Sequence, residues 1–200
     1  MNPETTAVIW VDVDNEFLEE KGKLHGAVKE VLEKNRVVAN MNELSRRARE
    51  AGVQVFFMPI QFSENYKEMG DDPDGIFKVV KDAGALKKGT WGAEVAQCLQ
   101  VEDGDVVLGE KNTTCAFAST SLEEELRRRG VTHLALGGLL TNVCVESTMR
   151  TAYDKGFKVF SLTDCSATVS LSSHEAAVTH DWPLFSTPMT HSEFLGQLEA

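Results

Sequence analysis

Short apolar, β-rich runs alternate with segments of helical period along most of this chain, and this alternation constrains the fold more than any other feature. The strand-like runs cover residues 7–11, 53–58, 105–109, 132–137 and 157–163, with a short one near Phe185. Helical periodicity covers residues 25–51, 119–129, 142–155 and 172–180. Strands joined by helices of this length lie parallel, with helices on both sheet faces. The pattern predicts a three-layer, Rossmann-like α/β fold with a mostly parallel six-stranded sheet.

The size and charge of the chain narrow its possible partners. Its 200 residues suit one domain over residues 1–200, and no repeat, low-complexity segment or linker divides it. The formal net charge is −11, and no basic block stands out beyond residues 127–129, which are typical of a solvated helix end. Nucleic acids and anionic membranes select for clustered positive charge, so we expect neither as a partner.

Two features favour a cytoplasmic location. No apolar run approaches membrane-spanning length, and residues 1–4 lack the basic and apolar regions of a secretory signal. The cysteines, which are Cys98, Cys115, Cys144 and Cys165, are widely spaced and form no Cys-x-x-Cys pair. Such free thiols are typical of the reducing cytosol.

Cys144 lies between a predicted strand and a predicted helix. In open parallel sheets, ligands bind beyond the carboxyl ends of the strands, which makes this turn a candidate site. With Thr141 or Asn142 as the helix N-cap, the helix dipole and free N–H groups would favour the Cys144 thiolate and could receive an oxyanion. The alternative is a small buried residue that packs the helix against the sheet.

Lys111 and Asp12 follow two other predicted strands. A lysine there could lower the pKa of a thiol and hold a substrate, and a carboxylate could accept the thiol proton. Taken singly, Lys111 is typical of a solvated loop, and Asp12 of an acidic turn or helix cap. Because Asp12, Lys111 and Cys144 all fall at the same sheet edge, we interpret them together as a site.

The chain resembles the isochorismatase-like cysteine hydrolases, which include nicotinamidases and N-carbamoylsarcosine amidohydrolases. Residues 8–18 are similar to the first strand and turn of that family. The middle motif of the family, a lysine with a following Phe and Leu, is similar to Lys111, Phe117 and Leu122. Its cysteine motif, which begins with a glycine and ends with an alanine, matches Gly138, Thr141, Cys144, Val145, Thr148 and Ala152. Asp164 and His174 resemble its downstream Asp and His. The resemblance covers nearly the whole chain, with the motifs in order.

This resemblance implies an Asp12–Lys111–Cys144 triad. Asp12 would take the proton of Cys144, and the thiolate would attack an amide carbon to form a thioester. The oxyanion would rest on the backbone N–H groups of Cys144 and Leu140. The cis peptide of the family falls here at Leu139–Leu140.

The sequence departs from the family at two places. Asp14 stands where the family usually has Gln, which alters an expected substrate contact. The Asp-x-His metal motif of nicotinamidases is absent, since the corresponding residues 58–62 contain neither Asp nor His. We therefore expect no metal and no other cofactor, and no nicotinamidase activity.

Several side chains are candidates for the pocket wall. Phe17, Phe62 and Trp91 could line it, although aromatic residues more often serve the core or an interface. Trp91 is favoured because glycines flank its turn. Whether Cys115 or Cys165 reaches the pocket stays open, whereas Cys98 is typical of core.

The predicted function is a hydrolase that cleaves the carbon–nitrogen bond of a small amide, ureide or carbamoyl compound. Two alternatives stay open: vinyl-ether hydrolysis of the isochorismatase type, and a non-catalytic binding or assembly role. The family also implies a homo-oligomer. The long segment 60–92 would supply its contacts through Phe62, Tyr66, Ile76, Phe77 and Val79.

Overall fold

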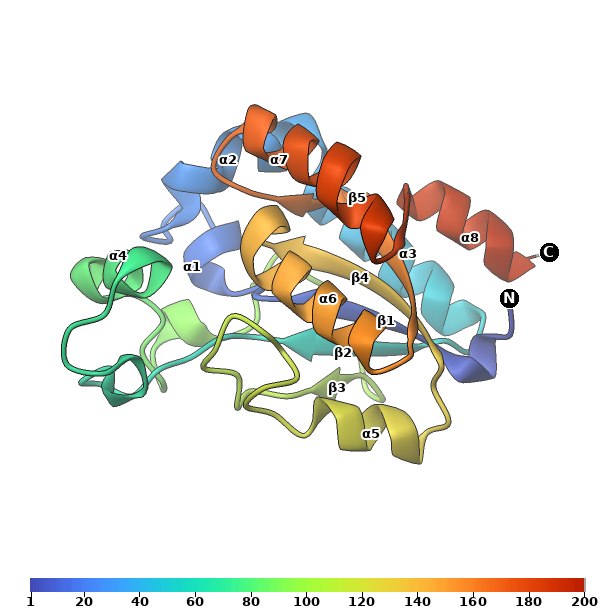
Figure 1. Cartoon of the computed structure of the whole chain (residues 1–200), viewed down its shortest axis with the longest axis horizontal. Coiled ribbons are helices and arrows are strands. Elements are labelled where there is room, and N and C mark those ends of the chain that lie inside the picture. The colour runs from blue at the N-terminus through green and yellow to red at the C-terminus, as the bar shows by residue number, and fades with distance from the viewer. Residues whose placement is uncertain (200) are drawn as a thin grey trace.

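A computed structural model, which describes residues 1–199, has a central six-stranded sheet in the order β3-β2-β1-β4-β5-β6 (Figure 1). All the neighbouring strands are parallel. The strands are β1 (Thr6–Val11), β2 (Gln54–Met58), β3 (Val106–Val107), β4 (His133–Leu139), β5 (Lys158–Ala167) and β6 (Thr187–Met189). Every residue of β1 is buried, as expected for a central parallel strand covered on both faces. The predicted fold class is confirmed.

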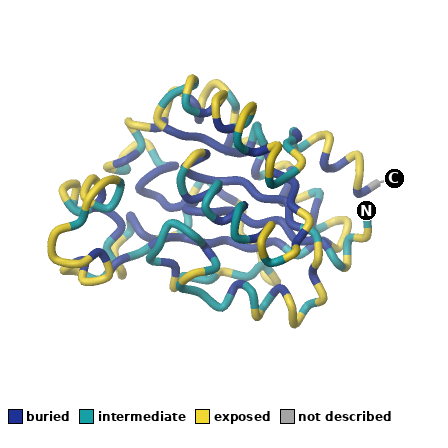
Figure 2. Tube along the Cα trace, viewed as in Figure 1, coloured by how far each residue is buried: buried dark blue, intermediate teal, exposed yellow. Residues whose placement is uncertain are grey.

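Helices cover both faces of the sheet (Figure 1). Val8 and Trp10 of β1 pack into a cluster with α2, α3 and α8, whereas Ile9 packs into a second cluster with α5 and α6. The central strands are therefore buried between two apolar layers (Figure 2). The helices are α1 (Asn15–Leu18), α2 (His25–Lys34), α3 (Val37–Glu50), α4 (Gly75–Ala83), α5 (Leu122–Arg128), α6 (Glu146–Asp154), α7 (Leu171–Ala176) and α8 (His191–Glu199). None of the helices within residues 1–199 is long and apolar enough to cross a membrane.

Several predicted boundaries were wrong. The helical pattern over residues 25–51 forms two helices, because Arg36 adopts a left-handed backbone conformation with φ 53° between them. The long segment 60–92, for which no helix was predicted, contains α4. The short last strand, expected near Phe185, covers Thr187–Met189, and α8 was not predicted. β5 continues to Ala167, so Asp164 lies inside a strand and not beyond its end.

The sheet topology brings the ends of β1 and β4 together. Successive connections lead outward in one direction from β1 through β2 to β3, and in the other from β4 through β5 to β6. A crevice therefore forms between β1 and β4 at their carboxyl ends, which is where ligands bind in open α/β sheets. The segment that contains α4 lies beyond this same end (Figure 1).

Gly138 of β4 lies close to Val11 of β1. Its φ is 127°, and a Cβ atom there would overlap the carbonyl oxygen of Val11 and lie 2.7 Å from the Val11 nitrogen. Both the left-handed backbone and the close contact require glycine.

We expect Gly138→Ala to lower the free energy of unfolding by about 4 kcal/mol or more, because strain and overlap act in the same core position. Gly26→Ala is the matched control. A Cβ at Gly26 meets nothing within 4 Å, so the change should be within about 1 kcal/mol. Chemical denaturation of both variants measures the difference, and equal effects would contradict the packing argument.

Candidate active site

Asp12 lies directly after β1, at the point where the chain turns. Its backbone is left-handed, with φ 51°, and its N–H donates a hydrogen bond of 2.9 Å to the carbonyl of Met58 at the end of β2. The side chain is 2% exposed. The end of the sheet thus holds the Asp12 carboxyl group in a buried position.

Lys111 lies beside Asp12 and is fully buried. Its Nζ is 2.7 Å from Asp12 Oδ1 and donates a hydrogen bond of 2.6 Å to the carbonyl oxygen of Thr113. The Lys111 backbone is anchored in turn, because its carbonyl accepts a hydrogen bond of 2.9 Å from the N–H of Gln61. The Lys111 ammonium, on the loop after β3, therefore compensates the negative charge of the Asp12 carboxylate.

Burial and charge act in opposite directions on this ion pair. Burial raises the pKa of Asp12, and the Lys111 ammonium and a hydrogen bond from the Cys144 thiol offset part of that rise. Burial lowers the pKa of Lys111, but the negative charge of Asp12 opposes this, and the net shift is upward. Lys111 therefore stays cationic and favours the ionised form of Asp12.

Cys144 lies in a π-helical turn, Thr141–Val145, that connects β4 to α6. Its thiol donates a hydrogen bond to Asp12, and the backbone N–H of Leu140 is directed at its sulfur. The Leu139–Leu140 peptide is cis, at the position expected from the sequence. Asp12, Lys111 and Cys144 thus meet at one place.

The charge state predicted for Cys144 was wrong. Burial raises the pKa of the Cys144 thiol well above its ordinary value, and the negative charge of Asp12 raises it further, whereas Lys111 and the Leu140 N–H only partly oppose this. The sulfur is thus held as a thiol. The helix start alone favours a thiolate, but burial beside a carboxylate favours the thiol.

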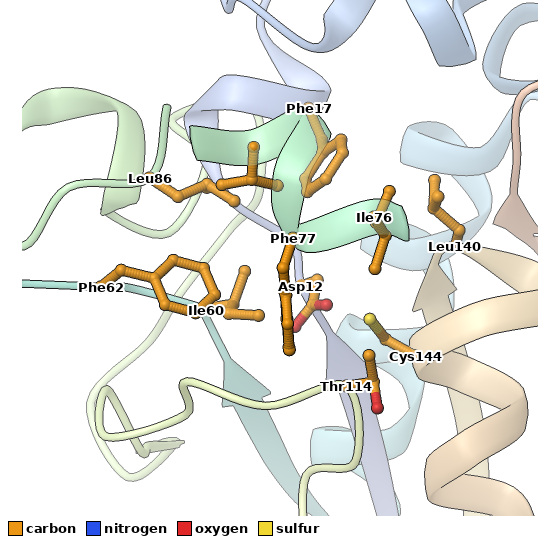
Figure 3. A pocket seen from close by; sticks show the side chains of 11 residues that line it. Asp12, Phe17, Ile60, Phe62, Ile76, Phe77, Leu86, Thr114, Leu140 and Cys144 are labelled. Carbon is orange, nitrogen blue, oxygen red and sulfur yellow. The ribbon is translucent and has the colours of Figure 1, made fainter. Parts of the chain in front are cut away.

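The thiol of Cys144 and the carboxyl group of Asp12 point toward one another at one side of a narrow pocket (Figure 3). The remaining wall is almost entirely apolar. It is formed by Phe17, Ile60, Phe62, Ile76, Phe77, Val80, Leu86, Thr114 and Leu140. Phe17 and Phe62 therefore lie in the wall, as expected for substrate contacts.

Helix α4 supplies part of this wall, which the sequence interpretation missed. Ile76, Phe77 and Val80 of α4 line the pocket, and the Phe77 ring packs edge-on against Phe62 at 5.8 Å between centroids. Phe62 and Tyr66, which were predicted as intersubunit contacts, are buried within the chain itself. The spacing of Ile76, Phe77 and Val80 is helical and was the signal available in the sequence.

Asp14 and Trp91 do not line the pocket. The Asp14 carboxyl is fully buried and accepts the N–H of Ile60 at 3.0 Å and 3.3 Å, behind the pocket wall. Burial raises the pKa of Asp14 well above its ordinary value, and the charge of Asp12 adds to the effect. The carbonyl of Trp91 accepts a hydrogen bond from Asn15, and its ring lies under the Lys21 ammonium at 4.0 Å.

The downstream Asp164 and His174 lie outside the pocket wall and have other partners. Asp164 accepts hydrogen bonds from the backbone and the ring of His191, at 2.8 Å and 2.6 Å, which ties β5 to α8. His174 is buried and contacts the Thr141 hydroxyl at 2.9 Å. Within residues 1–199, Asp164, Cys165 and His191 are the one group spaced closely enough to hold a metal, and none of them lines the pocket.

The other cysteines do not join the triad. Cys165 is buried beside Asp164, and Cys98 is half-buried with its pKa raised to about 12, mainly by burial and by Glu19. Cys115 contacts the Thr151 hydroxyl at 3.2 Å. None of these three is among the residues that line the pocket.

Comparison with known proteins gives consistent matches. Residues 6–193 match the family model described as the isochorismatase domain. The ureidoacrylate amidohydrolase RutB of Rhizobium rhizogenes (strain K84) is 30% identical over 164 residues, which cover 76% of this chain and 66% of that protein. The chain thus spans about two thirds of the length of this relative.

Two further matches cover nearly the whole chain. The uncharacterized isochorismatase family protein YecD of Escherichia coli O157:H7 is 29% identical over 198 residues, covering 99% of this chain and 98% of that protein. The crystal structure of a cysteine hydrolase from Pseudomonas syringae pv. phaseolicola 1448A superposes with a TM-score of 0.86 at 25% identity, covering 100% and 94% of the two chains. The expected family and fold are confirmed, and these names agree with an expected hydrolase.

The geometry of the triad predicts how the Cys144 thiol responds to a change at Asp12. We expect Asp12→Asn to lower the pKa of Cys144, because it removes the adjacent negative charge and leaves Lys111 unopposed. The ultraviolet absorbance of the thiolate, followed against pH, measures this pKa. Cys144→Ser in the same background should abolish the signal and so assign it. An unchanged or higher pKa would contradict the described contact.

Proposed function

Because the chain belongs to the isochorismatase domain family, we propose that it is a cysteine-dependent hydrolase of small amides, ureides or carbamoyl compounds. The observation that carries the proposal is the meeting of the Cys144 thiol, the Asp12 carboxylate and the Lys111 ammonium at one pocket. The name of the RutB relative, a ureidoacrylate amidohydrolase, supports carbon–nitrogen hydrolysis and is our reason for including ureides as candidate substrates.

In the first step, Asp12 acts as a general base. The Cys144 thiol donates its hydrogen bond to Asp12, so the proton moves to the carboxylate as the sulfur attacks the carbonyl carbon. Deprotonation in concert with attack suits a thiol of raised pKa, because no free thiolate has to accumulate. Lys111 keeps Asp12 ionised until the substrate arrives.

The tetrahedral intermediate has an oxyanion that needs hydrogen-bond donors. The N–H of Leu140, already directed at the sulfur, and the N–H of Cys144 are the donors in this proposal. The carbon–nitrogen bond then breaks, and protonated Asp12 gives its proton to the departing nitrogen. Water attacks the resulting thioester, Asp12 takes a proton from that water, and the Cys144 thiol is restored with release of the acid.

We expect Cys144→Ala to lower turnover of the best amide substrate by about 10³-fold or more, since the covalent route is lost. The measurement is ammonia release at saturating substrate. Cys115→Ala, which removes a thiol outside the pocket, is the control and should retain activity. Near-full activity of Cys144→Ala would instead favour acid-catalysed hydrolysis by Asp12, as in vinyl-ether cleavage.

The pH dependence of kcat/KM should report the ionisation of Asp12. Asp12 accepts a proton only as the carboxylate, and its pKa is raised by burial. Activity should therefore fall with decreasing pH at values above the usual aspartate pKa of about 3.9. Lys111→Met removes the cation that lowers this pKa, so the acidic limb should move to still higher pH.

The control for this profile is Lys34→Met, an exposed lysine at the end of α2. Its acidic limb should match that of the unmodified protein. An acidic limb in Lys111→Met that stays in place or moves to lower pH would contradict the role of Lys111.

A further inference from the structure

We infer that the substrate of this pocket is an uncharged amide or ureide with an apolar substituent, and that carboxylate-bearing amides are rejected. This inference rests on the proposed function and specifies its substrate class. It depends on the charge balance and the lining of the pocket.

The pocket has no spare cation. Among the described residues, its wall contains no Lys, Arg or His side chain. Lys111 reaches the rear of the site, but it is fully buried and its ammonium is engaged by Asp12 at 2.7 Å and by the Thr113 carbonyl at 2.6 Å. Protein sites for carboxylates commonly use an arginine or lysine, and such a group is missing here.

The charged groups next to the pocket also disfavour a second anion. Asp12 lines it as a carboxylate in the proposed mechanism, so the pocket already holds one negative charge. A substrate carboxylate would lose its hydration in an apolar enclosure and face Asp12 without a free counter-charge. Burial of an unpaired carboxylate is strongly unfavourable.

The wall instead matches an apolar group. Phe62 contacts Phe77 and Tyr66 with ring centroids 5.8 Å and 6.2 Å apart, which fixes an aromatic surface opposite Cys144. Leu86 lies on the same side as Phe62, and Ile76 lies on the side of Leu140 and Cys144 (Figure 3). Burial of a short branched alkyl or aryl substituent there would contribute favourable binding free energy. The amide carbonyl would then face the sulfur.

Thr114 is the one uncharged polar side chain of the described wall. Its hydroxyl lies 3.4 Å from the Ser147 hydroxyl. The oxygen of this hydroxyl points away from the Cys144 sulfur (Figure 3). The described wall therefore offers no polar side chain for a remote charge.

Substrate pairs of equal shape provide the test. 3-Methylbutanamide and malonamate differ only in an isopropyl group that replaces a carboxylate, and 2-methylpropylurea and N-carbamoylglycine form the same pair among ureides. Ammonia release by the full chain gives kcat/KM for all four compounds. We expect the neutral member of the preferred pair to be favoured by at least about 10²-fold.

A matched pair of variants tests the missing cation directly. Ile76 lies on α4 and is only partly buried, so a polar end can reach the pocket from this position with little effect on the core. Ile76→Lys should raise kcat/KM for malonamate and N-carbamoylglycine relative to their neutral partners. Ile76→Gln has similar length without charge and should not shift this ratio toward the carboxylates.

The outcomes separate this inference from the proposed function. Preference for the neutral compounds, with loss of activity in Cys144→Ala, supports both. Equal or greater activity on the carboxylates that still requires Cys144 would overturn the substrate class and leave the hydrolase intact. Turnover that does not require Cys144, or no turnover of any of the four compounds, would count against the proposed function itself.

Discussion

The buried ion pair between Asp12 and Lys111 is the interaction on which the rest of the site depends. Removing two charges from water is unfavourable unless close geometry and further hydrogen bonds compensate them. Here the 2.7 Å contact and the Thr113 carbonyl provide that compensation. The pair joins the end of β1 to the loop after β3, so it fixes local structure and the ionisation of Asp12 together. Cys144 then responds to the carboxylate and stays a thiol.

The sheet topology explains why these three residues, far apart in sequence, can share one pocket. β1 and β4 are adjacent, and the connections that follow them lead away in opposite directions. Gly138 permits β4 to approach β1 closely just before the turn that carries Cys144. α4 then covers the opening with Ile76 and Phe77. Rigid strands position the polar groups, and a separate helix supplies the apolar wall.

The sequence was sufficient to predict the location of the polar groups. Apolar strands alternating with helices imply a parallel sheet, and Asp12, Lys111 and Cys144 each follow a strand. The apolar wall of the pocket was harder to predict. Ile76 and Phe77 lie in a short helix, and the glycines and charged residues of that segment obscure the helical pattern. The positions of Asp14 and Trp91 depend on which way each side chain points, and periodicity does not give that direction. The protonation of Cys144 depends on burial, which emerges only from packing.

The apolar wall and the protonated thiol also fit together energetically. Before attack, the proposed reacting groups are a carboxylate, an ammonium and a neutral thiol, with no net charge. During attack the proton moves to Asp12, and the negative charge moves to the substrate oxyanion, so the total charge in the pocket is unchanged. A low-dielectric wall therefore has little effect on the overall charge balance, while it strengthens the hydrogen bonds that receive the oxyanion. A substrate with its own carboxylate would add one uncompensated charge at every step of the same sequence.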